Sequence, residues 1–255
     1  MVWPQIVLFG DSLTQFSWQE GGTGAALQDF FQRKFDVVNR GFSGFNSEWG
    51  LRFAERVFPE AVVEDIACLV IWFGANDSLL PDEAQAVPLE RYKANLRTLV
   101  DLVPLETPVI LINPPPFGPL GRSKYLGLPW DEGKTKLERT KEWTAVYAQA
   151  CLDVGKDLKA GEKGRYLTVI NLHDELEAAA FAFGKGSREE GMEQYLCDGV
   201  HLGPGGYKVV TAAILKALKE DHPGVYNKVQ EFPDWQDVDH RDPDRYLPRL
   251  GLTHE

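Results

Sequence analysis

Residues 66–77 read IACLVIWFGAND, and the continuous apolar run from Cys68 to Phe73 decides the fold class. A strand with one solvated face alternates apolar and polar residues, whereas a strand covered on both faces is apolar throughout. We therefore predict that residues 66–73 form a central strand of a parallel sheet.

The rest of the chain alternates short apolar runs with segments of helical period. The other predicted strands cover residues 5–9, 36–39, 107–112 and 166–172. The predicted helices cover residues 24–35, a segment that Ser47 could cap, and residues 92–103, 138–159 and 203–219. Strands separated by helices favour a doubly wound α/β sheet with helices on both faces.

The last stretch, residues 222–255, differs in composition from the part before it. It is rich in proline and acidic residues and lacks sustained periodicity. Because it also carries the aromatic residues Tyr226, Phe232, Trp235 and Tyr246, we expect it to pack against the preceding domain or against a partner. A partly disordered tail is the alternative.

Composition limits the classes of partner. The 27 basic and 38 acidic residues give a formal net charge of -11, which argues against binding to nucleic acid or to an anionic membrane. The three cysteines follow no metal or disulfide spacing and favour a reducing compartment. We expect no signal peptide, and no apolar run approaches the roughly 18 residues of a membrane span. These features predict a cytoplasmic protein without a membrane span.

Residues able to carry out chemistry follow the predicted strands. In a parallel sheet, sites form outside the carboxyl ends of the strands. Gly10-Asp11-Ser12 follows the first strand, so Ser12 could be a nucleophile. A serine at that position could equally cap a helix, which by itself is the commoner role.

A second element lies near the C-terminus, where Asp198 and His201 are three residues apart. At this spacing the carboxylate can accept the Nδ1–H of the imidazole, which leaves Nε2 free to take a serine proton. His201 could instead cap the helix that follows. Its carboxylate partner and glycine-rich surroundings favour the catalytic role.

Two further residues could bind an oxyanion. Asn76, after the third strand, offers its side-chain amide beside the backbone N–H groups of Ser12 and Gly44. The alternatives are an Asx turn at Asn76 and a left-handed turn at Gly44.

The sequence does not fit the motifs of a nucleophile elbow, a phosphate-binding loop or a zinc site. Residues 41–45 miss a Gly-x-Ser-x-Gly elbow by one position, and residues 21–24 lack the Gly-Lys-Ser/Thr ending of a phosphate loop. The five histidines show no zinc spacing. We therefore predict neither a cofactor nor a metal site.

Four segments together resemble the signature blocks of the SGNH (GDSL-type) hydrolases. They occur in the family's order, as Gly10-Asp11-Ser12-Leu13, Ser43-Gly44, Gly74-Ala75-Asn76-Asp77 and Asp198-Gly199-Val200-His201. The resemblance extends from residue 5 to about residue 220. Residues 117–133 and the C-terminal tail lie outside the more detailed similarity described below, and both could shape the acyl pocket.

The resemblance implies a flavodoxin-like three-layer α/β/α sandwich with a five-stranded parallel sheet, formed by residues 1–221. It implies a catalytic triad of Ser12, Asp198 and His201. The implied oxyanion hole consists of Ser12, Gly44 and Asn76. Asp11 and Asp77 would then support the site without taking part in the chemistry.

Within the family, the sequence is most similar to the isoamyl acetate-hydrolysing esterases, which share an early first strand and a proline run such as that at residues 114–116. This similarity implies a hydrolase of small acyl (acetate-type) esters that forms an acyl-serine intermediate. A thioesterase, an acyltransferase or an acetyl-sugar deacetylase would use the same triad, and a binding module without catalysis is a further alternative. The C-terminal extension could also mediate a homodimer. Trp18, Phe45 and Trp49 could line an apolar pocket or belong to the core.

Overall fold

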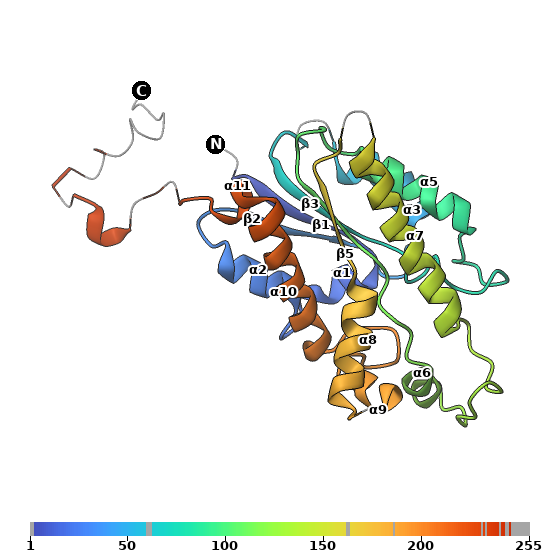
Figure 1. The fold of residues 1–255 in the computed structure, drawn as a ribbon. Helices are drawn as coiled ribbons and strands as arrows, with labels where there is room; N and C mark the ends of the chain where they lie inside the picture. Colours follow the sequence, from blue (N-terminus) through green and yellow to red (C-terminus); the bar gives the residue numbers. More distant parts are fainter. Residues whose placement is uncertain are drawn as a thin grey trace.

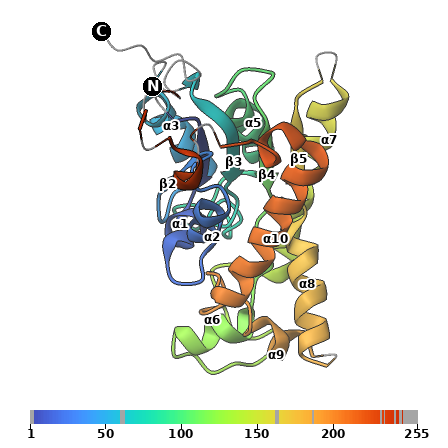
Figure 2. The ribbon, with the colours of Figure 1, turned by 90° about the vertical axis from the view of Figure 1, so that its left-hand side faces the viewer.

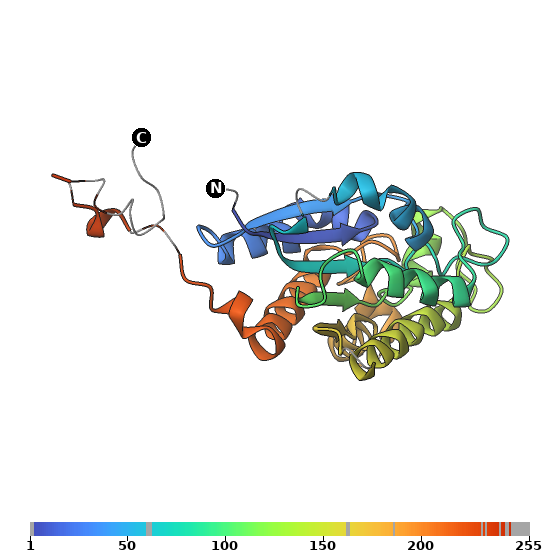
Figure 3. The same cartoon turned by 90° about the horizontal axis from the view of Figure 1, so that it is seen from above.

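A five-stranded parallel sheet runs through the molecule in the order β2-β1-β3-β4-β5. The structure is a computed structural model that describes residues 3–59, 63–161, 164–185, 187–230, 232, 234–239, 241–242 and 245. The strands are β1 Gln5–Gly10, β2 Asp36–Gly41, β3 Ile66–Trp72, β4 Val109–Ile112 and β5 Leu167–Ile170. All four neighbouring pairs are parallel, and Figure 3 shows the strand arrows pointing the same way.

Helices cover both faces of the sheet, as Figures 1 and 2 show from two directions. One face packs against α2 (Thr23–Phe30), α8 (Leu172–Phe183) and α10 (Pro204–Asp221). The other face packs against α3 (Ser47–Val57), α5 (Leu89–Val100) and α7 (Lys141–Ala160). Shorter helices lie in the connections: α1 Ser12–Gln15, α6 Pro119–Tyr125, α9 Arg188–Met192 and α11 Pro223–Tyr226. The predicted three-layer α/β/α sandwich is confirmed.

The apolar run of β3 contributes side chains to the hydrophobic cores on both faces of the sheet. Cys68 and Val70 belong to the core under α10, whereas Leu69 and Ile71 belong to the core under α5 and α7. Each of these four side chains is at most 1% exposed. The prediction of a central strand covered on both faces is therefore confirmed, and the same division explains the apolar β1 and β4.

Some predicted boundaries are wrong. The helix predicted over residues 24–35 ends at Phe30, and Arg33 adopts a positive φ of 62° that a continuing helix would not allow. The strand predicted over residues 166–172 ends at Ile170 because the Asn171 side chain accepts the N–H of Asp174 and caps α8. The helix α8 was not predicted, nor were the short α6 and α9.

The cap predicted at Ser47 is one residue out of place. The side chain of Asn46 accepts the Trp49 N–H at 2.9 Å and is the N-cap of α3. Ser47 is the first helical residue, and its hydroxyl donates to Asp77 in the buried loop after β3. Sequence alone could not rank two adjacent capping residues, because the choice depends on which of them faces the buried carboxylate.

The strand order reverses between β1 and β3, and the candidate site lies at the carboxyl edge of the sheet at this reversal. From β1 the chain moves outward to β2 in one direction and to β3, β4 and β5 in the other. Loops that leave neighbouring strands toward opposite faces open a crevice at the carboxyl edge. Ser12 begins the helix α1 that follows β1, and the loops after β2 and β3 carry Gly44 and Asn76.

The described part of residues 222–255 contacts the amino end of the sheet at several points. The Tyr226 ring lies 5.3 Å from that of Phe30, and the Phe232 ring lies 5.5 Å from that of Trp3. Trp235, in contrast, is 73% exposed, and Tyr246 lies outside the described residues. The division into residues 1–221 and an extension of residues 222–255 stays a prediction. Within the described ranges, no helix is long and apolar enough to cross a bilayer.

Candidate active site

Ser12 occupies the first residue of α1, directly after β1. The helix begins there because the Asp11 carboxylate accepts the Leu13 N–H at 2.9 Å, so that Asp11 is the N-cap. The alternative in which Ser12 caps this helix is therefore wrong. Its hydroxyl remains available, in a residue that is 4% exposed.

The loop from Asp198 to His201 precedes α10 and folds around one carboxylate. Asp198 Oδ1 accepts the backbone N–H groups of Val200 at 2.9 Å and His201 at 2.7 Å. This tight turn places Gly199 at a φ of 82°, where a Cβ would lie 2.3 Å from the Gly118 carbonyl oxygen. Only glycine satisfies both conditions at position 199.

The structure brings the three residues of the predicted triad together. His201 Nδ1 lies 2.7 Å from Asp198 Oδ2, and His201 Nε2 lies 2.9 Å from Ser12 Oγ. When Nδ1 donates its proton to Asp198, Nε2 is an acceptor for the serine hydroxyl. The Phe16 ring packs edge-on against the imidazole, with the ring centroids 5.5 Å apart. This arrangement can activate a hydroxyl nucleophile.

The Asp198 carboxylate is held in its charged form. Burial by itself raises the pKa of Asp198, but the hydrogen bonds from the His201 side chain and backbone, together with that from Val200, lower it below its ordinary value. A carboxylate that stays charged can orient the imidazole and stabilise its protonated form.

Gly44 and Asn76 lie in the adjacent loops at the same edge. Gly44 has a φ of 82°, and its carbonyl oxygen accepts from Gln85 Nε2 at 2.6 Å. Asn76 Nδ2 donates to the Phe45 carbonyl at 2.8 Å, which leaves the second amide hydrogen for another acceptor. The loops after β2 and β3 are thus joined through one of the predicted oxyanion donors.

A buried polar network supports these loops, and of its members the sequence pattern indicated Asp77 as a supporting residue and Ser47 as a cap. Asp77 accepts the backbone N–H and the hydroxyl of Ser47, and Asn95 Nδ2 donates to Ser47 Oγ at 2.9 Å. Asp77, Ser47 and Asn95 are at most 2% exposed. Asn95 is a polar residue inside the otherwise amphipathic helix α5, which is the one signal that could have revealed it.

The three aromatic residues expected to line an apolar pocket or belong to the core differ: Phe45 lines a surface pocket, whereas Trp18 and Trp49 are partly exposed. Trp18 and Trp49 are both 36% exposed, so neither is a core residue. The Phe45 ring stacks on Phe42 at 5.1 Å and meets Trp49 edge-on at 6.0 Å. Together with Phe53, Phe42 and Phe45 line a surface pocket of about 510 Å³.

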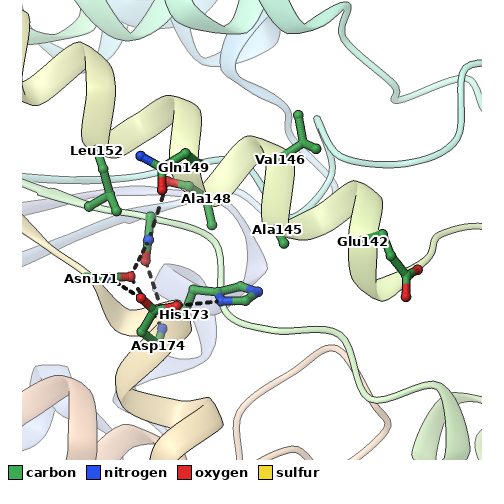
Figure 4. A pocket seen from close by; sticks show the side chains of 10 residues that line it. Glu142, Ala145, Val146, Ala148, Gln149, Leu152, Asn171, His173 and Asp174 are labelled. Carbon is green, nitrogen blue, oxygen red and sulfur yellow. Dashed lines mark hydrogen bonds and ion pairs between the residues drawn. The ribbon is translucent and has the colours of Figure 1, made fainter.

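Figure 4 shows another pocket, of about 350 Å³, between α7 and the start of α8. It holds a second His–Asp pair, in which His173 Nδ1 lies 3.2 Å from Asp174 Oδ1. Of the described residues that line it, none is Ser, Thr or Cys, and none belongs to the predicted triad or oxyanion hole. Among the described residues, no three His, Cys, Asp or Glu side chains gather as metal ligands.

Comparison with known proteins agrees with this geometry. Residues 6–214 match the profile of the GDSL-like Lipase/Acylhydrolase family. The chain belongs to this family. A GDSL esterase/lipase of Arabidopsis thaliana is 37% identical over 249 residues, which cover 94% of this chain and 95% of that protein.

Two further similarities extend the comparison of this GDSL hydrolase. An isoamyl acetate-hydrolyzing esterase 1 homolog of Rattus norvegicus is 36% identical, over 97% of this chain and 93% of that protein. The crystal structure of a lipase/acylhydrolase from Enterococcus faecalis has a TM-score of 0.60 and 25% identity, and the match covers 84% of this chain and 95% of that one. The protein is thus a serine carboxylester hydrolase of the SGNH type, as predicted.

Two buried carboxylates next to the site carry raised pKa values. Burial raises the pKa of Asp11 from 3.8 to about 7, against the Leu13 hydrogen bond and with the help of the Asp77 charge. Burial likewise raises the pKa of Asp77 to about 6, against the hydrogen bonds from Ser47. Above these pKa values the folded hydrolase contains buried charges that the unfolded chain would hydrate.

The pH dependence of stability should reveal Asp11. Below about pH 4 its carboxyl is protonated in both states, whereas above about pH 7 the folded state bears the full desolvation cost. Stability therefore falls as pH rises through this window. Asp11→Asn, which keeps the helix cap, should remove up to about 4 kcal/mol of that fall, at about 1.4 kcal/mol per pKa unit. Urea unfolding of both proteins between about pH 4 and about pH 8 measures the difference, and parallel curves would contradict the assignment.

Proposed function

We propose that the enzyme hydrolyses small acyl esters of the acetate type through an acyl-serine intermediate. The observation that carries this proposal is the unbroken hydrogen-bond chain from Asp198 through His201 to Ser12. Ser12 is the nucleophile, His201 is the general base, and Asp198 orients the imidazole and stabilises its protonated form.

In the first half of the reaction, Ser12 Oγ attacks the ester carbonyl while its proton moves to His201 Nε2. The tetrahedral oxyanion accepts hydrogen bonds from the backbone N–H groups of Ser12 and Gly44 and from the free amide hydrogen of Asn76. As this intermediate collapses, the proton on His201 passes to the departing alkoxide. The alcohol leaves, and the acyl group remains on Ser12.

In the second half, water replaces the alcohol. His201 takes a proton from the water as it attacks the acyl-serine, and the same three donors hold the second oxyanion. Collapse releases the carboxylic acid and returns the proton to Ser12 Oγ. A thioesterase, an acyltransferase or a deacetylase would share the acyl-serine step and differ only in leaving group or acceptor.

Two observations support a small acyl group. Ser12 is 4% exposed and Asn76 is 9% exposed, so little of either residue is open to an approaching acyl group. The homolog of Rattus norvegicus is named for the hydrolysis of isoamyl acetate, an ester with a two-carbon acyl group.

A cytoplasmic location, predicted from composition, and a homodimer, predicted from the C-terminal extension, remain predictions.

Covalent labelling should identify the nucleophile. An organophosphonate should add one equivalent to Ser12, as intact mass and peptide mapping would report, and Ser12→Ala should neither be labelled nor turn over p-nitrophenyl acetate. Folded wild-type protein that resists the reagent would contradict this mechanism.

Asn76→Ala should lower kcat by about 10²–10³-fold, which is the usual cost of losing one oxyanion donor. KM should change little, because the donor is strongest toward the transition state. Steady-state kinetics with p-nitrophenyl acetate measures both parameters. A rise in KM with kcat unchanged would show that Asn76 only binds the substrate.

A substrate panel should fix the acyl preference. With p-nitrophenyl esters from acetate to dodecanoate, we expect kcat/KM to be highest for the shortest acyl groups and to fall with length. An acetyl thioester and an acetylated sugar extend the panel to the other acyl transfers. A maximum at long chains would refute the small-ester proposal and leave the triad intact.

A further inference from the structure

Oppositely charged side chains connect the Asp198 loop with the Asn76 loop. Arg122 Nη1 lies 3.9 Å from Asp198 Oδ2, and Arg122 Nε donates to Glu138 Oε1 at 2.6 Å. The same glutamate oxygen lies 3.6 Å from Arg139 Nε. Arg122, Glu138 and Arg139 are called the Arg–Glu–Arg cluster below.

The far end of the Arg–Glu–Arg cluster reaches the backbone next to the oxyanion donor. Arg139 Nη1 donates to the Ala75 carbonyl oxygen at 2.7 Å. This carbonyl belongs to the planar peptide group that also contains the Asn76 nitrogen. A charge-assisted hydrogen bond to it therefore fixes the plane from which the Asn76 side chain departs.

The cluster is too deeply buried to be an ordinary surface ion pair. The side chains of Arg122, Glu138 and Arg139 are 19%, 18% and 7% exposed. Burial lowers the pKa of Arg139, and the neighbouring Glu138 opposes that effect. Buried ion pairs contribute little net stability compared with apolar side chains of the same volume, so stability alone does not explain this one.

Backbone contacts hold the cluster against both loops. The Leu80 N–H donates to the Glu138 carbonyl at 2.9 Å, which ties the segment before α7 to the loop after β3. The Gly118 N–H donates to the Gly199 carbonyl at 2.9 Å, which ties the start of α6 to the Asp198 loop. The cluster therefore lies where α6 and the connection to α7 meet the two halves of the site.

We propose that the Arg–Glu–Arg cluster positions the catalytic groups: Arg139 and Glu138 act through Asn76, and Arg122 acts through Asp198. None of the three touches the reacting atoms in the mechanism above, so they are positioning residues. The inference rests on the proposed function, because it assigns Asn76 to the oxyanion.

A double-mutant cycle tests the action through Asn76. Glu138→Gln keeps the shape of the side chain but removes the charge that holds both arginines. We expect it to lower kcat by about 10- to 100-fold with little change in KM, since a displacement of about 1 Å in a catalytic group can cost about 10²-fold. In the Asn76→Ala background the same substitution should cost clearly less kcat than in the wild type, because only the part of the effect that passes through Arg122 and Asp198 remains.

Arg165 provides a matched control. It is a buried arginine, 6% exposed, whose guanidinium donates to the carbonyls of Pro104, Val100 and Val103 before β4. Arg139→Lys and Arg165→Lys should both lower the urea midpoint, but only Arg139→Lys should lower kcat. This comparison separates a positioning role from a general loss of packing.

Two results would overturn the proposal. One is an equal loss of kcat on Glu138→Gln in the wild-type and Asn76→Ala backgrounds. The other is a folded Arg139→Lys protein with the kcat of the wild type. Failure of the proposed function would look different, as p-nitrophenyl acetate hydrolysis that survives Ser12→Ala, and it would overturn both ideas.

Discussion

Ser12 Oγ and His201 Nε2 lie 2.9 Å apart, although the two residues are 189 positions apart in the sequence. The elements that carry them must therefore pack close together. A parallel sheet makes this meeting possible, because its strands all deliver their carboxyl ends to one edge. The loop after β1 supplies one partner at that edge. The other comes from the turn before α10, which packs on the same side of the sheet as α2. The position of α10 against the sheet is thus a condition for the proposed chemistry.

Two buried carboxylates at the edge of the sheet lower the stability of the fold, but they hold the backbone of the site in place. Asp11 and Asp77 are fully buried carboxylates, and each holds a helix start or a loop through hydrogen bonds to backbone N–H groups. An apolar residue at either position would avoid the desolvation cost but would leave those N–H groups without an acceptor. The enzyme therefore keeps costly charges beneath the site, as is common where function requires a fixed backbone.

The connection between β4 and α7 contacts two of the loops that form the candidate site. The segment contains Arg122 on α6 and the pair Glu138 and Arg139 before α7, and it contacts the loops of both Asn76 and Asp198. Because its contacts are backbone hydrogen bonds and buried ion pairs, its shape constrains the two loops jointly. Arg122, within residues 117–133, and the Glu138–Arg139 pair beyond them therefore lie beside the loops of the proposed site.

The sequence by itself determined the strand pattern, the switch from strand to loop at Gly10 and Gly74, and the local Asp198–His201 pair. These features depend on neighbours within a few residues, through apolar periodicity and the left-handed backbone of Gly199. Only the tertiary structure decided that Asp11 and Asn46 are the caps in place of Ser12 and Ser47. It alone revealed that Arg139 binds the Ala75 carbonyl 64 residues away. The physical reason is that a donor selects its acceptor according to burial and distance, and both of these arise only when separate segments pack together.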